Sequence, residues 1–176
     1  MPQAPRVTVI GGAPGSGKTS LARLLAAAHP NGVHIETDSF FRSLAHRIDP
    51  SLPEAQRQNE TVIRAYAAAA RAYADGGFRV FLDGVIGPWA LPLIAASVPR
   101  FEYVILHGPL ALLLARTGAR TDQPSATPDL VAHMHAQFDA VQGEWARHVI
   151  AIEGRSLDAL AGQCRAGGHD RLFDGG

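Results

Sequence analysis

Short apolar runs alternate along the chain with longer stretches in which apolar residues recur at helical spacing. Five runs rich in β-branched and apolar residues predict buried strands, over residues 6–10, 33–36, 79–83, 101–106 and 149–152. Strands that alternate with helices in this way predict an α/β fold, in which helices cover both faces of a parallel sheet.

Helix boundaries are predicted from capping patterns between these strands. A Ser-x-x-Glu pattern at 51–54 opens an alanine-rich helix that we expect to end at Asp75, before two glycines. A Thr-Pro-Asp start at 127–129 predicts a helix that reaches about residue 147, and Ser156 is expected to cap the last helix.

The 176 residues suffice for one domain and are too few for two ordinary ones, so we expect a single domain over 1–176. Its core is expected over about 6–166, and the glycine-rich tail at 167–176 is expected to fray. Cys164 is the only cysteine, which excludes an internal disulfide and a cysteine-based metal site. His133 and His135 are two residues apart on a predicted helix, so they point to different faces and do not predict a metal pair.

The first predicted strand leads into a complete match to Gly-x-x-x-x-Gly-Lys-[Ser/Thr]. Glycines let the backbone wrap so that its N–H groups point at a phosphate, and the following helix adds the positive end of its dipole. Lys18 is placed to bridge the β- and γ-phosphates, and the Thr19 hydroxyl is placed to ligate Mg²⁺. The expected nucleotide-binding residues here are Gly12, Ala13, Pro14, Gly15, Ser16, Gly17, Lys18, Thr19 and Ser20.

Lysine usage separates the classes of protein that carry such a loop. Fifteen of the sixteen basic residues are arginine, and Lys18 is the only lysine. GTP-binding switch proteins read guanine with Asn-Lys-x-Asp, which needs a second lysine, and the Leu-Ser-Gly-Gly signature of transport ATPases is absent. Ring-forming mechanical ATPases need a longer module with a helical lid domain. Small kinases remain, and they need an acid near the second strand, a carboxylate that supports Mg²⁺ and arginines on a lid.

The second predicted strand ends in Glu-x-Asp, followed by an arginine four residues beyond the aspartate. In a parallel sheet the carboxyl ends of the strands line the ligand crevice. Asp38 is therefore a candidate general base for an attacking hydroxyl, and Glu36 is a candidate to hold a Mg²⁺-bound water. The alternative is that Asp38 only caps a helix that begins near Ser39.

Further candidates follow the second and third strands. Asp83 ends an apolar strand in the manner of a Walker B site, where it supports Mg²⁺ or contacts the acceptor. Trp89 follows as a candidate pocket wall, with a place in the core as the alternative. Asn59 lies near the first turns of the alanine-rich helix and is a candidate acceptor contact.

Arg116 and Arg120 lie one helical turn apart after the fourth strand, before a loop that contains Gly, Pro or Ser residues over about 121–127. Arginines in such a lid neutralise charge as a γ-phosphoryl group moves. The alternative is that both belong to a solvated helix face.

Together these motifs resemble the small P-loop kinases grouped with chloramphenicol phosphotransferase and the zeta toxins, within the AAA-type P-loop NTPase superfamily. The resemblance spans roughly residues 7–152. It implies a three-layer sandwich of about five parallel strands in the adenylate-kinase-like order 2-3-1-4-5, with flanking helices and a short lid. It also implies that Asp38 is the general base, that Arg42 contacts the acceptor, that Arg116 and Arg120 clamp ATP, and that Arg155 lies in the adenine pocket.

The predicted activity is ATP- and Mg²⁺-dependent transfer of a γ-phosphoryl group to a hydroxyl of a small molecule, either a metabolite or an antibiotic. The alternatives are a non-catalytic ATP-binding module and a toxin-type kinase that acts on a nucleotide sugar. Sixteen basic side chains balance sixteen acidic ones, so we expect neither nucleic acid nor an anionic membrane as partner. No apolar run approaches the roughly 18 residues of a membrane span, and the first residues lack the pattern of a signal peptide, so a cytoplasmic location is expected.

Overall fold

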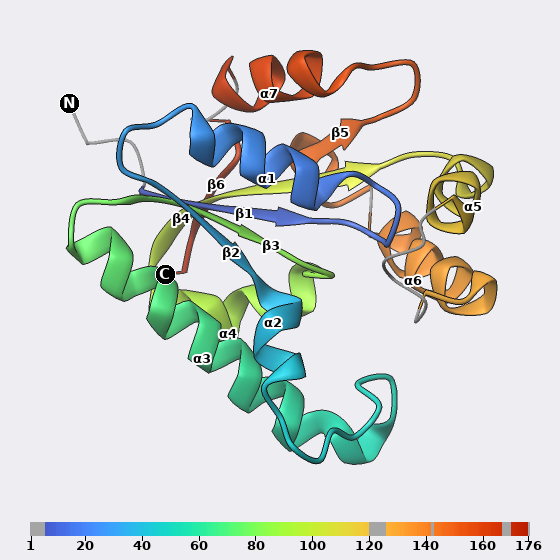
Figure 1. The fold of residues 1–176 in the computed structure, drawn as a ribbon, viewed down its shortest axis with the longest axis horizontal. Coiled ribbons are helices and arrows are strands. Elements are labelled where there is room, and N and C mark those ends of the chain that lie inside the picture. The colour runs from blue at the N-terminus through green and yellow to red at the C-terminus, as the bar shows by residue number, and fades with distance from the viewer. Residues whose placement is uncertain (1–5, 120–125, 142, 167–169, 176) are drawn as a thin grey trace.

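The computed structural model describes residues 6–119, 126–141, 143–166 and 170–175, and it contains one sheet between two layers of helices (Figure 1). The strands are paired in the order β2-β3-β1-β4-β5, and all these pairs are parallel. This confirms the predicted order 2-3-1-4-5. The strands are β1 (Val7–Gly11), β2 (Gly32–Glu36), β3 (Arg79–Asp83), β4 (Arg100–His107), β5 (Val149–Ala151) and β6 (Leu172–Asp174).

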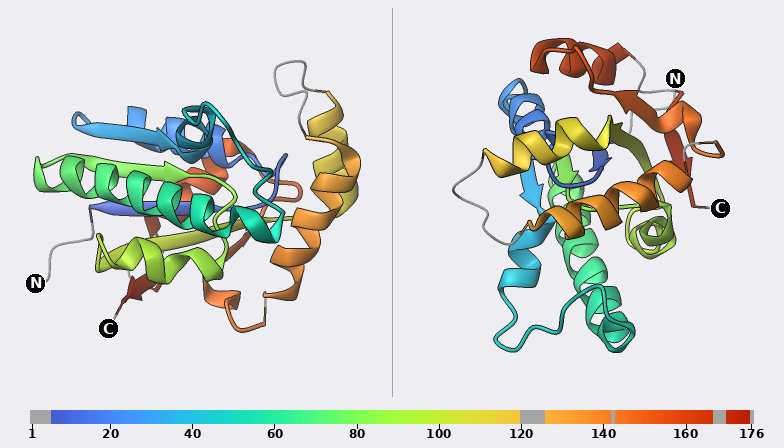
Figure 2. Two further views of the ribbon diagram at one scale, coloured as in Figure 1. Left: turned by 90° about the horizontal axis from the view of Figure 1, so that it is seen from below. Right: turned by 90° about the vertical axis from the view of Figure 1, so that its right-hand side faces the viewer.

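The helices form the outer layers and cover one end of the sheet. Helices α1 (Lys18–Ala27) and α7 (Leu157–Ala166) lie on one face, and α3 (Gln56–Asp75) and α4 (Leu91–Ala95) lie on the other (Figure 1). Helices α5 (Leu110–Gly118) and α6 (Pro128–Ala140) cross the carboxyl end of the sheet (Figure 2), and α2 (Thr37–Arg42) follows β2 directly. Three short 3₁₀ turns, η1 (Pro53–Ala55), η2 (Pro88–Ala90) and η3 (Ala146–His148), complete the described elements.

Burial along the strands explains why their sequences are apolar rather than alternating. All five residues of β1 are buried, because this strand is central and helices cover both of its faces. In β2, at the edge of the sheet, only Ile35 is buried. The three-layer arrangement therefore follows from the apolar runs that predicted it.

The tail that was expected to fray, residues 167–176, is described only in part, since residues 167–169 and 176 lie outside the described residues, and its described part contains a short strand. Residues 172–174 form β6, which pairs antiparallel with the start of β4. The Phe173 ring stacks on that of Phe101 at 5.0 Å, and the Tyr103 N–H donates to the Arg171 carbonyl at 2.9 Å. These contacts hold the segment in place, and the neighbouring glycines obscured the short strand in the sequence.

Two predicted helix boundaries are also corrected. The Ser51 hydroxyl donates to Asp49 instead of capping a helix, so the chain passes through η1 before α3 begins at Gln56. The helix predicted to reach residue 147 ends at Ala140. The chain turns there because Trp145 packs edge-on against Tyr103 of β4, at 5.9 Å between ring centroids.

A polar network closes the amino end of the sheet, opposite the phosphate-binding motif. The Thr8 hydroxyl donates to Glu102 Oε2 at 2.7 Å, and Arg79 Nη2 donates to the same oxygen at 2.9 Å and to Thr8 Oγ1 at 3.0 Å. Thr8 and Glu102 are buried, and Arg79 is partly buried. The buried charges at this end are therefore paired and hydrogen-bonded.

Among the described helices, none combines the length and the apolar character that a membrane crossing requires.

Candidate functional site

The Gly-x-x-x-x-Gly-Lys-Thr segment forms a loop between β1 and α1. Gly15 and Gly17 have φ angles of 83° and 91°, in the left-handed region that glycine adopts without strain. A Cβ atom on Gly15 would lie 2.6 Å from the Leu113 carbonyl oxygen, so the loop is packed closely against α5. Gly17 occupies the N-cap position of α1, which directs the positive end of that helix at the loop.

Ser16 gives the loop an unsatisfied polar atom. Its side chain is fully buried, and its Oγ has no hydrogen-bond partner among the described residues. A buried hydroxyl without a partner is unfavourable, and anionic oxygens are suitable acceptors for it. The glycine backbone and this hydroxyl together fit a phosphate group.

Beside the loop, Thr19 and Asp83 are in direct contact. The Thr19 hydroxyl donates to Asp83 Oδ2 at 2.6 Å, although the two residues are 64 positions apart. Asp83 is almost completely buried, at 1% exposure, and its Oδ1 lies 2.5 Å from Nε2 of His34 on β2. A hydroxyl and a carboxylate at this place are the oxygen donors that Mg²⁺ prefers, so the donor set fits that ion.

His34 was missed by the sequence reasoning. It lies on β2 two residues before Glu36, which is opposite Asp83 in the β2–β3 register, so His34 and Asp83 are on the same face of the sheet. Only this register, together with the strand order, could have indicated the contact.

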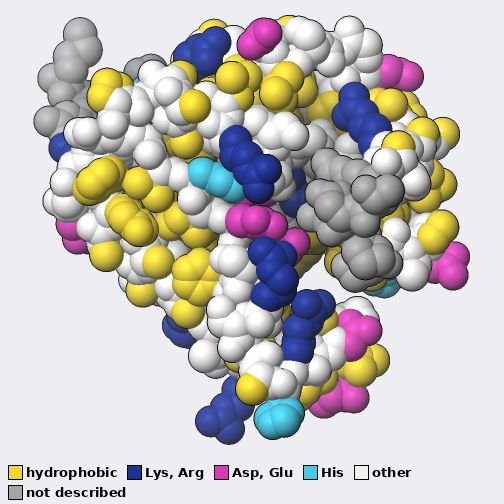
Figure 3. All heavy atoms as spheres, viewed as in Figure 1, with side chains coloured by type: hydrophobic (Ala, Val, Ile, Leu, Met, Phe, Trp, Pro, Cys, Tyr) yellow, Lys and Arg dark blue, Asp and Glu magenta, His cyan; other side chains and the backbone are white. Residues whose placement is uncertain are grey.

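Helix α2, which begins directly after β2, carries the candidate acceptor residues Asp38 and Arg42. Asp38 is in the first turn of α2 and is exposed. The alternative of a cap for a helix near Ser39 is wrong, because α2 begins at Thr37 and Glu36 occupies its N-cap position. Glu36 Oε1 lies 3.4 Å from Arg42 Nη2, so these two predicted residues pair with each other. Acidic and basic side chains gather over α2 and the segment after it (Figure 3).

Asn59 holds backbone rather than facing an open site. Its Nδ2 donates to the Pro50 carbonyl at 2.8 Å, and the neighbouring Gln58 bonds both the N–H and the carbonyl of Ile48. These bonds fasten the loop after α2 to the start of α3. An acceptor contact by Asn59 stays a prediction, with a structural partner already present.

Trp89 is in η2, shortly after β3, and is 51% exposed. Its ring lies 5.7 Å from that of Phe138, a fully buried residue of α6. This exposure disfavours the alternative that Trp89 belongs wholly to the core. Its role as a pocket wall, between the end of β3 and α6, stays a prediction.

Two of the three arginines predicted on the nucleotide side, Arg116 and Arg155, are among the described residues. Arg116 is half-buried on α5, the helix whose Leu113 carbonyl contacts Gly15 of the phosphate loop. Arg120 lies outside the described residues. Arg155 is exposed, and its guanidinium donates to Gln163 of α7. The structure thus packs the helix that carries Arg116 against the phosphate loop, while the ATP contacts of Arg116 and Arg155 stay predictions.

Comparison with known families and structures agrees with this geometry. A family model described as AAA domain matches residues 7–142. This range covers most of the chain, includes the phosphate loop, Asp38, Asp83 and Arg116, and agrees with the resemblance to small P-loop kinases. No curated protein matches the chain in sequence.

Solved structures share the fold at low sequence identity. A sugar kinase from Janibacter sp. has a TM-score of 0.67 at 18% identity, covering 92% of this chain and 93% of its own. A gluconokinase from Sinorhizobium meliloti has a TM-score of 0.65 at 20% identity, covering 95% and 93%. The tunicamycin resistance protein of Deinococcus radiodurans has a TM-score of 0.68 at 20% identity, covering 93% and 95%. The likeness covers more than nine-tenths of this chain and of each of the three structures, so the fold is shared over nearly all of their described lengths.

Proposed function

The chain belongs to the AAA domain family of P-loop NTPases, and from that premise we propose that it transfers the γ-phosphoryl group of ATP to a hydroxyl of a small molecule. The observation that carries the proposal is the register of β2 and β3. Glu36 is opposite Asp83, so the turn that holds Asp38 begins beside the Thr19–Asp83 pair. A candidate base and a candidate metal site are thereby adjacent at the carboxyl end of the sheet.

Each residue then has a distinct part in the reaction. The loop N–H groups and the Ser16 hydroxyl bind phosphate oxygens, and Lys18 neutralises charge on the β- and γ-phosphates. The oxygen of the acceptor hydroxyl bonds to the γ-phosphorus, and Asp38 accepts the proton of that hydroxyl. The bond between the γ-phosphorus and the oxygen that leaves with ADP breaks. Arg116 on α5 stabilises the charge that develops on the transferred group.

Thr19 and Asp83 are the residues that would hold Mg²⁺, and this choice assigns Asp83 to the metal rather than to the acceptor. When bound there, Mg²⁺ would offset the negative charge of the phosphates. On the acceptor side, the guanidinium of Arg42, the last residue of α2, pairs with Glu36, and Trp89 provides an apolar wall. The similar structures described as a sugar kinase and a gluconokinase support an alcohol as the acceptor class.

The test begins with an ATP-consumption screen of the purified protein over hydroxylated metabolites and antibiotics, with each phosphorylated product confirmed by mass. Asp38→Asn should then lower kcat by about 10²–10⁴-fold while ATP affinity is retained, because only the proton acceptor is lost. Asp75→Asn is the matched control, since Asp75 is an exposed aspartate at the far end of α3.

Full phosphotransfer by Asp38→Asn would overturn the base assignment. ATP binding without product across the screen, with Asp38 intact, would favour a non-catalytic nucleotide-binding module. Product only with a nucleotide sugar, together with growth arrest on expression, would favour a toxin-type kinase.

A further inference from the structure

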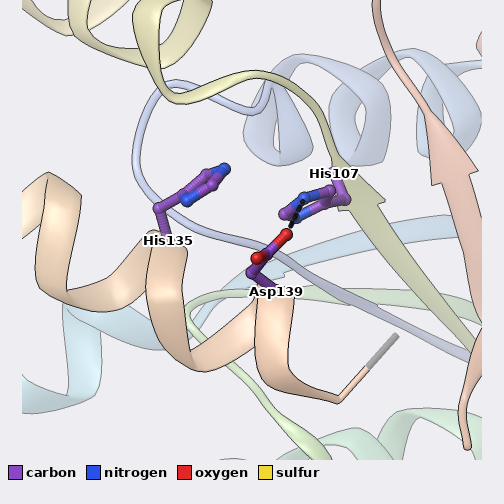
Figure 4. Close-up of side chains that lie close together, drawn as sticks. All are labelled: His107, His135 and Asp139. Atoms are coloured by element: carbon purple, nitrogen blue, oxygen red, sulfur yellow. Dashed lines mark ion pairs between the residues drawn. The ribbon is translucent and has the colours of Figure 1, made fainter. Parts of the chain in front are cut away.

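A second group of ligand-type side chains lies between β4 and α6, apart from the Thr19–Asp83 pair. His107 ends β4, and His135 and Asp139 are four residues apart on α6 (Figure 4). One possible ligand atom from each of the three side chains lies within 4.8 Å of the other two. His135 was not predicted to bind a metal, because its nearest histidine in the sequence, His133, points to a different face of the helix.

The fold explains why these three residues meet. Residues four apart on a helix share a face, so His135 and Asp139 point to the same side of α6. That side packs over the end of β4, where the His107 and His135 rings lie 4.8 Å apart and His107 Nε2 lies 3.4 Å from Asp139 Oδ1. All three side chains line one open cavity of about 290 Å³, which Glu153 and two residues of β5 complete.

Hydrogen bonding prepares His135 to act as a ligand. Its Nε2 lies 3.0 Å from the Gly108 carbonyl oxygen. A carbonyl only accepts, so this bond places the proton on Nε2 and leaves the lone pair on Nδ1. Histidines that bind metals usually make such a bond through their second nitrogen, which fixes the ring and its tautomer.

The His107 and Asp139 side chains differ in their exposure to solvent. The His107 side chain is 12% exposed, so the sheet holds it firmly, whereas the Asp139 side chain is 63% exposed and can move. Burial, and after it the neighbouring His135, lower the pKa of His107, against the opposing effect of Asp139. Ligand atoms around a tetrahedral zinc ion with bonds of 2.0–2.1 Å are about 3.3 Å apart. The 3.4 Å between His107 Nε2 and Asp139 Oδ1 already matches this spacing, and all three ligand atoms lie within 4.8 Å of one another, so small side-chain rotations that include His135 would complete the site.

We propose that His107, His135 and Asp139 bind a transition-metal ion of the zinc type, with water in the fourth position. Zn²⁺ binds imidazole nitrogen and carboxylate oxygen, whereas Mg²⁺ and Ca²⁺ prefer oxygen ligands alone. Two imidazoles and one carboxylate therefore suit zinc better than Mg²⁺ or Ca²⁺. The ion would link α6 to the end of β4. The site is independent of the phosphotransfer reaction, since none of its residues has a part in that proposal.

The test uses the full chain. Transition metals are first removed with a chelator, excess Mg²⁺ is then added to occupy the Thr19–Asp83 site, and Zn²⁺ is titrated in a calorimeter. The wild type and His133→Ala should each bind one equivalent of Zn²⁺. His135→Ala and Asp139→Asn should lose at least about tenfold in affinity, since loss of a ligand costs no less than loss of its supporting group. His133 is the matched control because it is exposed on the same helix, two residues from His135.

Two further measurements separate metal binding from a folding defect. Zn²⁺ should raise the Tm of the wild type and of His133→Ala but not that of His135→Ala, because only a ligand bound to the folded state stabilises it. Co²⁺ in place of Zn²⁺ should give an intense visible spectrum of tetrahedral type, which Asp139→Asn alters. Equal Zn²⁺ affinity in the wild type and His135→Ala, or an equal loss in His133→Ala, would overturn the proposal.

Discussion

The two ends of strand β3 carry buried charges that are handled in opposite ways. At the amino end, Arg79 bonds Glu102 and Thr8, and Glu102 also accepts from Thr8, so the three side chains satisfy one another. Four residues later Asp83 accepts from the Thr19 hydroxyl and lies 2.5 Å from Nε2 of His34, beside the phosphate loop. The amino end is closed by side chains of neighbouring strands, whereas the carboxyl end places a buried carboxylate beside the phosphate loop.

This difference indicates what each end contributes. A closed set of ionic and hydrogen-bonding partners holds strands together and gains nothing from a ligand. A buried carboxylate beside a hydroxyl, next to a loop with an unpartnered Ser16 Oγ, is costly in the free protein and becomes favourable when a cation and phosphates are bound. The amino end therefore supports stability, and the carboxyl end holds binding capacity.

The largest effect is expected when the carboxyl end loses its charge. Asp83→Asn keeps the shape of the side chain but removes the metal-binding carboxylate, so kcat for phosphotransfer should fall by about 10²–10³-fold. The free energy of unfolding should change by less than about 1 kcal/mol, since neutralising a buried charge offsets a weakened hydrogen bond. Steady-state kinetics with the acceptor from the screen and thermal melts check both. A kcat within tenfold of the wild type would contradict the assignment of ligand binding to the carboxyl end of β3.

A loss of stability with unchanged kcat is expected when the amino end of the sheet loses the charge of Glu102. Glu102→Gln leaves Arg79 partly buried without its ionic partner, which should destabilise the fold by about 3 kcal/mol. For a chain of this size the Tm would fall by roughly 6–12 °C. Below the melting range kcat should stay unchanged. A large loss of kcat without a loss of Tm would show that the two ends are not separate.

A smaller effect is expected at Ser16. Ser16→Ala removes a buried hydroxyl that has no partner among the described residues, so the free protein should keep its stability or gain up to about 1 kcal/mol. ATP affinity should fall about tenfold, the value of one hydrogen bond to a charged group. Ser97→Ala, a half-buried serine beyond α4, is the control and should leave ATP affinity unchanged. Unchanged affinity in Ser16→Ala would show that this hydroxyl does not face a phosphate.

The sequence predicted those parts of the fold and site that depend on local patterns. Apolar runs mark β1 to β5, and the glycine and lysine spacing marks the phosphate loop. Asp83 was predicted because it ends an apolar strand. Its contact with Thr19 then follows from the strand order, which the family resemblance supplied.

The remaining features depend on contacts that no local pattern carries. Helix α6 ends early because Trp145 packs on Tyr103, 42 residues away in the chain. His107 meets His135 only because α6 crosses the end of β4. Strand β6 is three residues long and needs Phe101 as a platform, so its own sequence shows little of it.

Lys18, half-buried at the start of α1, makes the phosphate loop chemically unique in this protein. The chain has one ε-amino group in 176 residues, so an amine-directed reagent has a single side-chain target. Labelling of that amine, read as a mass shift on the peptide that contains Lys18 so that the N-terminal α-amino group does not contribute, reports directly on the loop. A nucleotide that covers the amine would slow the shift, which provides an occupancy assay that needs neither a known acceptor nor turnover.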